Sequence, residues 1–130
     1  MIDIILVPRL VEFYDPWGGL FDRRPTAAEV ARARVRPVPL LLRGHRTRAY
    51  DLGRVRFFRD ELCAGRMCEP LEVDNYCQDT HIYGPFVVDG HHRLCGALLA
   101  GQLTLPVHYS GRVDTLRYLR GQRRTPPRDL

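Results

Sequence analysis

The apolar residues of this chain occur in short runs separated by glycine and proline, a pattern typical of a small domain built from both strands and helices. Runs rich in β-branched and aromatic residues predict four strands of a small mixed sheet, at residues 38–42, 71–74, 82–88 and 105–109. Pro37 and Pro39 lie at the beginning of the first strand, so we expect that strand at an edge of the sheet. We expect residues 86–88 to be the buried end of the third strand, and residues 76–80 to be a polar connection.

Apolar residues at helical spacing predict two main helices, at residues 52–64 and 91–100, and we expect both to pack on the sheet. The side chain of Asp51 is suited to capping the first helix, because a carboxylate can accept a hydrogen bond from a free N–H group of the first turn. Gly65 and Gly101 follow the last apolar positions and are placed to end the two helices. Together the strands and helices predict an α+β fold.

We divide the chain into three regions: an N-terminal extension packed on the core at residues 1–34, an α+β domain at 35–121, and a disordered basic tail at 122–130. The extension contains a short apolar strand at residues 4–7 and a helix at 27–34, which the capping-box spacing of Thr26 and Glu29 opens. Its aromatic and apolar side chains are expected to form a cap on the core: Phe13, Tyr14, Trp17, Leu20 and Phe21. A last helix, near residues 113–119, closes the domain.

The basic residues limit the chemistry that the chain can perform. The net charge is +5, and all 20 basic residues are arginine. Without lysine, neither a Schiff-base nucleophile nor the lysine of a Walker A loop is available, so an anion must be held by arginine, histidine, backbone N–H groups or a metal. This charge favours a nucleotide or a nucleic acid as partner, with the arginine-rich C-terminal residues adding contacts to the latter.

Two further features bear on membrane association and on metal binding. No apolar run approaches the ~20 residues needed to cross a bilayer, and the N-terminus lacks the pattern of a signal peptide, so we expect no membrane partner and a cytoplasmic location. Cys68 and Cys77 flank the predicted strand at 71–74. At ~3.3 Å per residue the ends of that strand are too far apart for both thiols to bind one zinc ion, so we expect separate thiols.

The segment Asp89-Gly90-His91-His92-Arg93 combines the end of a strand, a glycine turn and the start of a helix. The first N–H groups of a helix have no acceptor within the helix, and the helix dipole makes that end positive, so this geometry binds phosphate. Gly90 allows close approach of the backbone, and Arg93 can bind two phosphate oxygens at once. Asp89 has three alternative roles: it caps the helix, holds Arg93 or His91, or binds Mg²⁺. The alternative to a phosphate site is an exposed polar turn.

The order of elements around this motif, over about half of the chain, resembles the ParB/sulfiredoxin superfamily. The resemblance is carried by these segments in order: a helix ending in Ala64-Gly65, Pro70-Leu71-Glu72-Val73, a strand ending in Val87-Val88-Asp89-Gly90, the helix start His91-His92-Arg93-Leu94-Cys95-Gly96-Ala97, the stop Ala100-Gly101, and Leu105-Pro106-Val107.

Members of that superfamily bind ATP, ADP or CTP with the phosphates on this helix start, so the resemblance implies nucleotide contacts from Gly90 to Arg93 and a second contact from Arg46 or Arg48. His91 stands where sulfiredoxins have their catalytic cysteine, and sulfinic-acid reduction is therefore not expected. ParB clamps carry a helix-turn-helix domain after this module, and because this sequence ends at Leu130 we do not expect that clamp function. The string from residue 89 to residue 93 is most similar to that of the superfamily's free-serine kinases.

Three functions remain open from the sequence. The first is nucleotide-dependent phosphotransfer or hydrolysis, with His92, Asp89 and Asp51 as candidate catalytic residues and Mg²⁺ as cofactor. Glu12 is a further acid that could activate a hydroxyl group or bind a metal. The second is a nucleotide- or DNA-binding module without chemistry. The third is a ParB-like nuclease that cleaves with a metal ion held by Asp89.

Overall fold

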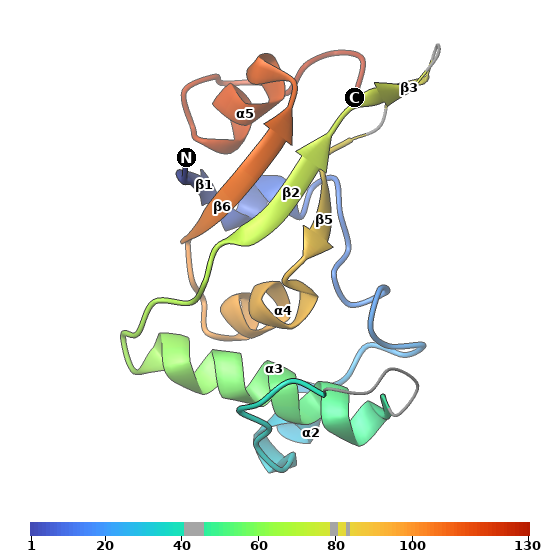
Figure 1. Cartoon of the computed structure of the whole chain (residues 1–130), viewed down its shortest axis with the longest axis vertical. Helices are drawn as coiled ribbons and strands as arrows, with labels where there is room; N and C mark the ends of the chain where they lie inside the picture. The colour runs from blue at the N-terminus through green and yellow to red at the C-terminus, as the bar shows by residue number, and fades with distance from the viewer. Residues whose placement is uncertain (41–45, 79–80, 83) are drawn as a thin grey trace. The chain divides into compact units, whose positions relative to one another are not determined.

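The computed structural model describes residues 1–40, 46–78, 81–82 and 84–130 of the chain, with side chains left undescribed at 77–78 and 81–82. The described residues form five helices, a four-stranded mixed sheet and a separate two-stranded one, so the predicted α+β class is confirmed (Figure 1). The chain forms two compact units. The first comprises Met1–Asp15, Glu69–Gly90 and Leu103–Leu130, and the second comprises Pro16–Cys68 and His91–Gln102. No helix in the described ranges is long and apolar enough to cross a membrane.

The four-stranded sheet forms the centre of the first unit. Its strands lie in the order β1 (Asp3–Leu6), β6 (Thr104–Gly111), β2 (Leu71–Asn75) and β5 (Phe86–Asp89). β6 and β2 are parallel neighbours in Figure 1, whereas the two edge strands pair in the antiparallel sense. One face of the sheet is apolar because alternate residues point to it, and these are buried: Ile5, Leu71, Val73, Val87, Leu105 and Val107.

The remaining elements of the first unit are short. Helix α1 (Val7–Leu10) follows β1 directly, the hairpin strands β3 (Cys77–Gln78) and β4 (His81–Ile82) pair with each other, and α5 (Val113–Leu119) follows β6. Residues 122–130, for which the sequence predicts a disordered tail, are described in irregular backbone. The carbonyl oxygen of Arg123 accepts a hydrogen bond from Arg9 at 2.6 Å, and Asp129 pairs with Arg112 at 3.0 Å.

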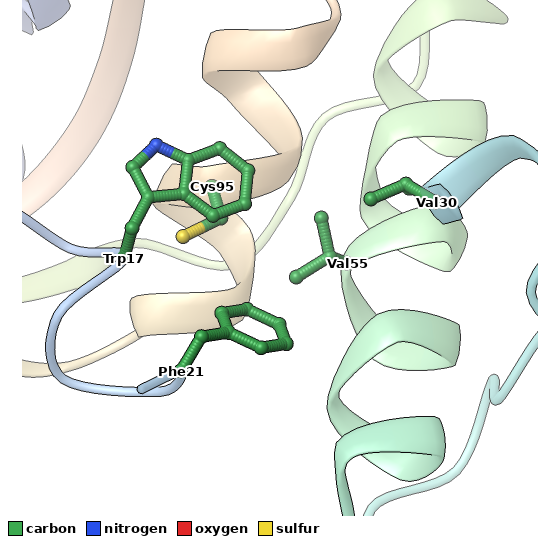
Figure 2. Packing of buried hydrophobic residues seen from close by; sticks show 5 residues of the cluster. All are labelled: Trp17, Phe21, Val30, Val55 and Cys95. Carbon is green, nitrogen blue, oxygen red and sulfur yellow. The ribbon is translucent and has the colours of Figure 1, made fainter. Parts of the chain in front are cut away.

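The second unit consists of α2 (Ala27–Arg32), α3 (Arg48–Cys63) and α4 (His91–Leu99). α3 and α4 cross closely at Gly96, where an added Cβ would lie 2.7 Å from the Cβ of Phe58. The apolar core of this unit comes from all three helices and the segment before α2, and Figure 2 shows its buried members: Trp17, Phe21, Val30, Val55 and Cys95. The aromatic residues that the sequence assigns to a cap are thus partly core residues of this unit.

Several elements form where the sequence predicts them. The capping box at Thr26 and Glu29 is present in both directions and opens α2. α4 and α5 agree with the predicted helices to within one residue at each end. Gly65 and Gly101 adopt φ values of 80° and 68° after the ends of α3 and α4, a conformation that glycine adopts without steric cost.

Four predictions about the strands and the segments between them are wrong. Residues 38–40 form no strand, and residues 41–42 lie outside the described part. The edge of the sheet that was expected at 38–42 is formed by β1. The predicted connection at 76–80 contains β3, and the predicted strand at 82–88 is divided into β4 and β5. Val88 is 47% exposed rather than buried, because alternation along β5 turns its side chain away from the apolar face.

Candidate phosphate-binding site

The start of α4 has the backbone geometry that a glycine turn requires. β5 ends at Asp89, Gly90 has a φ of 106°, and α4 begins at His91. Non-glycine residues rarely adopt this φ, so the chain can change from strand to helix within one residue only because Gly90 has no Cβ. The N–H groups of the first turn, which includes His92 and Arg93, have no acceptor within the helix.

The start of α3 lies four residues earlier than predicted, and this changes the role of Asp51. Thr47 is the N-cap, and its hydroxyl group accepts a hydrogen bond from the N–H of Tyr50 at 3.1 Å. Asp51 lies inside the first turn of α3 and is only 3% exposed. The prediction that Asp51 caps the helix is therefore wrong, because the polar residue four positions before it takes that place.

Asp51 instead joins two other residues that the sequence selected. One carboxylate oxygen, Oδ1, lies 2.8 Å from Nε2 of His92, and the other, Oδ2, accepts a hydrogen bond from Nε of Arg46 at 3.0 Å. The ring of Tyr50 meets the His92 ring edge-on, with 5.9 Å between the centroids. The second unit therefore brings together His92, Asp51 and Arg46, which lie up to 46 positions apart in the sequence.

Burial and two neighbouring arginines lower the pKa of His92, whereas Asp51 raises it. Desolvation lowers the pKa of His92 below its usual value of 6.5, and the positive charges of Arg54 and Arg46 lower it further. The hydrogen bond to Asp51 and the negative charge of Asp51 raise the pKa of His92, but they do not offset the lowering that burial causes. His92 is therefore neutral at pH 7 in the folded protein.

The lowered pKa of His92 predicts a stability that depends on pH. Because the unfolded chain binds the His92 proton at higher pH than the folded chain does, this contribution is fully present above about pH 6.5 and is lost as the pH falls through the folded pKa. We expect the wild type to lose more stability than the His92→Gln variant when the pH falls from about 7 to about 5. Urea denaturation at each pH measures the difference, and equal losses in the two proteins would contradict it.

Arg54 is a residue of this site that no sequence motif singled out. It lies on α3 three positions after Asp51 and is 9% exposed. Its Nη1 donates a hydrogen bond to the carbonyl oxygen of Arg36 at 3.0 Å, and its guanidinium carbon lies 4.8 Å from the centroid of the Phe58 ring. The sequence does contain a pattern that could have pointed to Arg54. This residue adjoins Val55 on the apolar face of the predicted helix, where an arginine is unexpected.

The guanidinium of Arg54 lacks a negative partner. It forms no ion pair with any residue that the structure describes, and its Nε is buried without a hydrogen bond. Its Nη2 also lacks a hydrogen-bond partner within the described ranges, but it is not buried as Nε is. Desolvation lowers the pKa of Arg54, and the like charge of Arg93 lowers it further, against the opposite effect of Tyr50. Arg54 nevertheless remains charged at pH 7, because an arginine side chain is not deprotonated in proteins.

A cavity of about 400 Å³ lies on the side of Asp51 that Arg46 occupies. Its lining includes the aromatic ring of Phe21 and charged side chains of both signs: Asp22, Arg23, Arg46, Arg48 and Asp51. Arg48 is held by Glu29 at 3.0 Å and by the carbonyl oxygen of Arg23 at 3.0 Å. The structure thus places Arg46 and Arg48 on one cavity. Arg43 and His45, two further basic or titratable residues just before them in the sequence, lie outside the described residues.

The other candidate residues lie in the first unit. Asp89 is exposed at the end of β5, where it is opposite Glu72 in the sheet. Glu12 accepts a hydrogen bond from the hydroxyl group of Tyr118. In the part of the chain that the structure describes, no group of three or more histidine, cysteine, aspartate or glutamate side chains could hold a metal ion. Mg²⁺ is commonly bound by one or two carboxylates together with substrate phosphates, so Asp89 remains a prediction as its ligand.

Comparisons of this chain with protein-family models, curated proteins and solved structures find no match.

Proposed function

We propose that this chain binds a nucleoside di- or triphosphate through its phosphates at the start of α4, as a ParB/sulfiredoxin-like domain, and transfers or hydrolyses the terminal phosphoryl group. The observation that carries the proposal is the buried cation of Arg54, which has no carboxylate partner among the described residues. Burying an unpaired charge costs several kcal/mol, and a phosphate group would supply the missing negative charge. The carbonyl oxygen of Arg36 and the ring of Phe58 compensate part of this cost, and a bound phosphate would offset more of it.

The groups around Arg54 suit a phosphate ligand. The charge of Arg93, from the first turn of α4, acts on Arg54, so both guanidinium groups add to the positive potential at this place. The N–H groups and the dipole at the start of α4 add further donors and a positive potential. A guanidinium binds phosphate oxygens in pairs, which fixes the orientation of the phosphate as well as its position.

Phosphoryl transfer is the chemistry that this arrangement favours. The reaction needs mainly positioning of the phosphates and stabilisation of the charge that develops on their oxygens. Arg54 and Arg93 would provide both, and the neutral imidazole of His92, held by Asp51, lies beside them. The cavity of about 400 Å³ beside Arg46 and Asp51 is where we would place the part of the ligand that carries no phosphate.

The direct test is nucleotide binding by the wild type and by two arginine variants. We expect ATP, ADP or CTP to raise the melting temperature of the wild type, with GTP and omission of Mg²⁺ as comparisons. Arg54→Met and Arg93→Ala should each weaken binding about 10- to 150-fold, the equivalent of losing one charge-assisted hydrogen bond of about 1.5–3 kcal/mol. Isothermal titration calorimetry measures both affinities.

The arginine variants have a matched control and a check on folding. Arg66→Met removes a side chain that is 64% exposed and pairs with Glu61, and we expect it to bind nucleotide as the wild type does. Arg54→Met should melt no lower than the wild type, because replacing a buried unpaired charge by an apolar side chain is often neutral or stabilising. Wild-type affinity in both site variants, or no shift in melting temperature with any of the nucleotides, would refute the proposal.

The dependence of binding on salt distinguishes a nucleotide site from a nucleic-acid surface. Affinity for DNA falls steeply as salt increases because each neutralised phosphate releases counterions, whereas a mononucleotide site is less sensitive. We expect the affinity for the bound nucleotide to change less between 50 and 200 mM salt than the ~10³-fold or greater loss of a DNA-binding protein. A steep loss, together with tighter binding to DNA than to mononucleotides, would favour the DNA-binding alternative.

A further inference from the structure

The two ring nitrogens of His92 have different surroundings. Nε2 lies 2.8 Å from the carboxylate of Asp51, which is almost fully buried. Nδ1 makes no hydrogen bond with any described residue, and it is not among the buried polar atoms that lack a partner. Nδ1 is therefore open to solvent or to a ligand, while Nε2 is fully engaged.

The surroundings of Asp51 determine which nitrogen carries the proton. Asp51 faces the guanidinium of Arg46 and acts as a carboxylate, which can only accept hydrogen bonds. The hydrogen bond between Asp51 and His92 therefore requires a proton on Nε2 of His92. Because His92 is neutral at pH 7, Nδ1 then has a free lone pair, which is the state that a general base needs.

Asp51 itself is poorly suited to accept a proton from substrate. Its two carboxylate oxygens are occupied by separate donors, Nε2 of His92 on Oδ1 and Nε of Arg46 on Oδ2. A reacting group would have to displace one of them from a side chain that is 4% exposed. The geometry thus separates two roles, a buried carboxylate that orients an imidazole and an imidazole that presents its other nitrogen.

We propose that His92 is the general base of this site and that it activates a water molecule through Nδ1, with Asp51 as a positioning residue. The proposal rests on the proposed function, because it requires a nucleoside triphosphate with its phosphates at the start of α4.

In the proposed step, an O–H bond of the water breaks and its proton passes to Nδ1 of His92. The water oxygen forms a bond to the terminal phosphorus, and the P–O bond to the nucleoside diphosphate breaks. The diphosphate leaves with the electron pair, and the imidazolium of His92 returns its proton to solvent.

The charged and titratable groups that face His92 fit this role. From α3 these are Tyr50, Asp51 and Arg54, and from the segment before α3 the group is Arg46. The two arginines oppose protonation of His92 and so keep Nδ1 available at pH 7. Asp51 stabilises the imidazolium that forms once the proton has been transferred.

The test measures release of inorganic phosphate from the nucleoside triphosphate that binds most tightly, ATP or CTP, in the presence of Mg²⁺. We expect the His92→Gln variant, whose amide can still donate to Asp51, to lower kcat about 10²- to 10⁴-fold and to change nucleotide affinity less than 3-fold. The wild-type kcat should fall at acidic pH as His92 becomes protonated, and the variant should lose this acidic limb. Added imidazole should partly restore phosphate release by His92→Ala.

Asp51→Asn tests the positioning role separately. An asparagine can accept from or donate to Nε2, so it no longer enforces one tautomer. We expect kcat to fall by a larger factor than nucleotide affinity does, and ¹⁵N NMR should show a proton on Nε2 alone in the wild type but on either nitrogen in Asp51→Asn. Unchanged phosphate release by His92→Gln, a proton on Nδ1 in the neutral wild type, or a wild type that binds nucleotide without releasing phosphate would overturn the role of His92 and leave nucleotide binding standing. A wild type that binds no nucleotide would instead refute the proposed function.

Discussion

Replacing Trp17 by alanine is expected to lower the free energy of unfolding by about 3–5 kcal/mol. Trp17 is 4% exposed and packs in the core of the second unit, where its ring lies 6.1 Å from that of Phe21 and faces Val55 and Cys95 (Figure 2). An alanine would remove the apolar contacts of the indole and leave a cavity that three helices and a loop cannot close without strain. Urea denaturation followed by circular dichroism measures the loss.

A matched control for Trp17 is Val38→Ala in the same unit, because Val38 is 66% exposed. We expect this variant to remain within about 0.5 kcal/mol of the wild type, as is usual for exposed positions. If Trp17→Ala cost no more than Val38→Ala, the indole would not be part of the core, and the aromatic residues would form only a surface cap.

Replacing Gly111 by alanine should lower the free energy of unfolding by about 2–6 kcal/mol, the sum of a strained backbone conformation and a steric clash that each cost about 1–3 kcal/mol. Gly111 is the last residue of β6 and has a φ of 132°. A Cβ there would lie 1.7 Å from the carbonyl oxygen of Asn75, its partner in β2. The strands must separate at this end, so thermal and urea denaturation should both show the loss.

Gly65→Ala separates the two causes of the Gly111 effect. Gly65 also has a positive φ, of 80°, but an added Cβ would meet nothing within 4 Å. We expect a loss of only about 1–2 kcal/mol, the cost of a left-handed conformation alone. If both variants lost the same free energy of unfolding, the backbone at Gly111 and Asn75 could move apart without cost. The close contact between β6 and β2 would then not restrict the side chain at position 111.

The predicted edge strand at residues 38–42 shows where sequence patterns are weakest. Short apolar runs at residues 4–7 and 38–42 fit an edge strand equally well, since each has the composition of a strand and each adjoins proline. The choice depends on which run meets the free edge of β6, and β1 does so, with Asp3 opposite Val107. Pairing between residues about a hundred positions apart is a tertiary property and leaves no local signal.

Asp51 shows, at the candidate site, the same limit of prediction from sequence patterns. Asp51 and Thr47 are both good N-cap residues, so the sequence allows the helix to begin at either. The structure begins the helix at Arg48, and this places Asp51 and Arg54 on the side of α3 that meets His92. A difference of four residues in the start of one helix thus turns a presumed cap into the partner of a histidine.

What the sequence determined by itself is local. The capping box of α2, the glycine that turns the chain into α4, and the start of α4 at His91 all follow from conformational preferences of neighbouring residues, and all are present. The tertiary structure alone decided that Asp51, Arg46 and His92 meet, and that the charge of Arg54 is buried without a carboxylate partner within the described residues. Burial and ion pairing depend on how α3 packs against α4 at Gly96, and no pattern along a single chain specifies that contact.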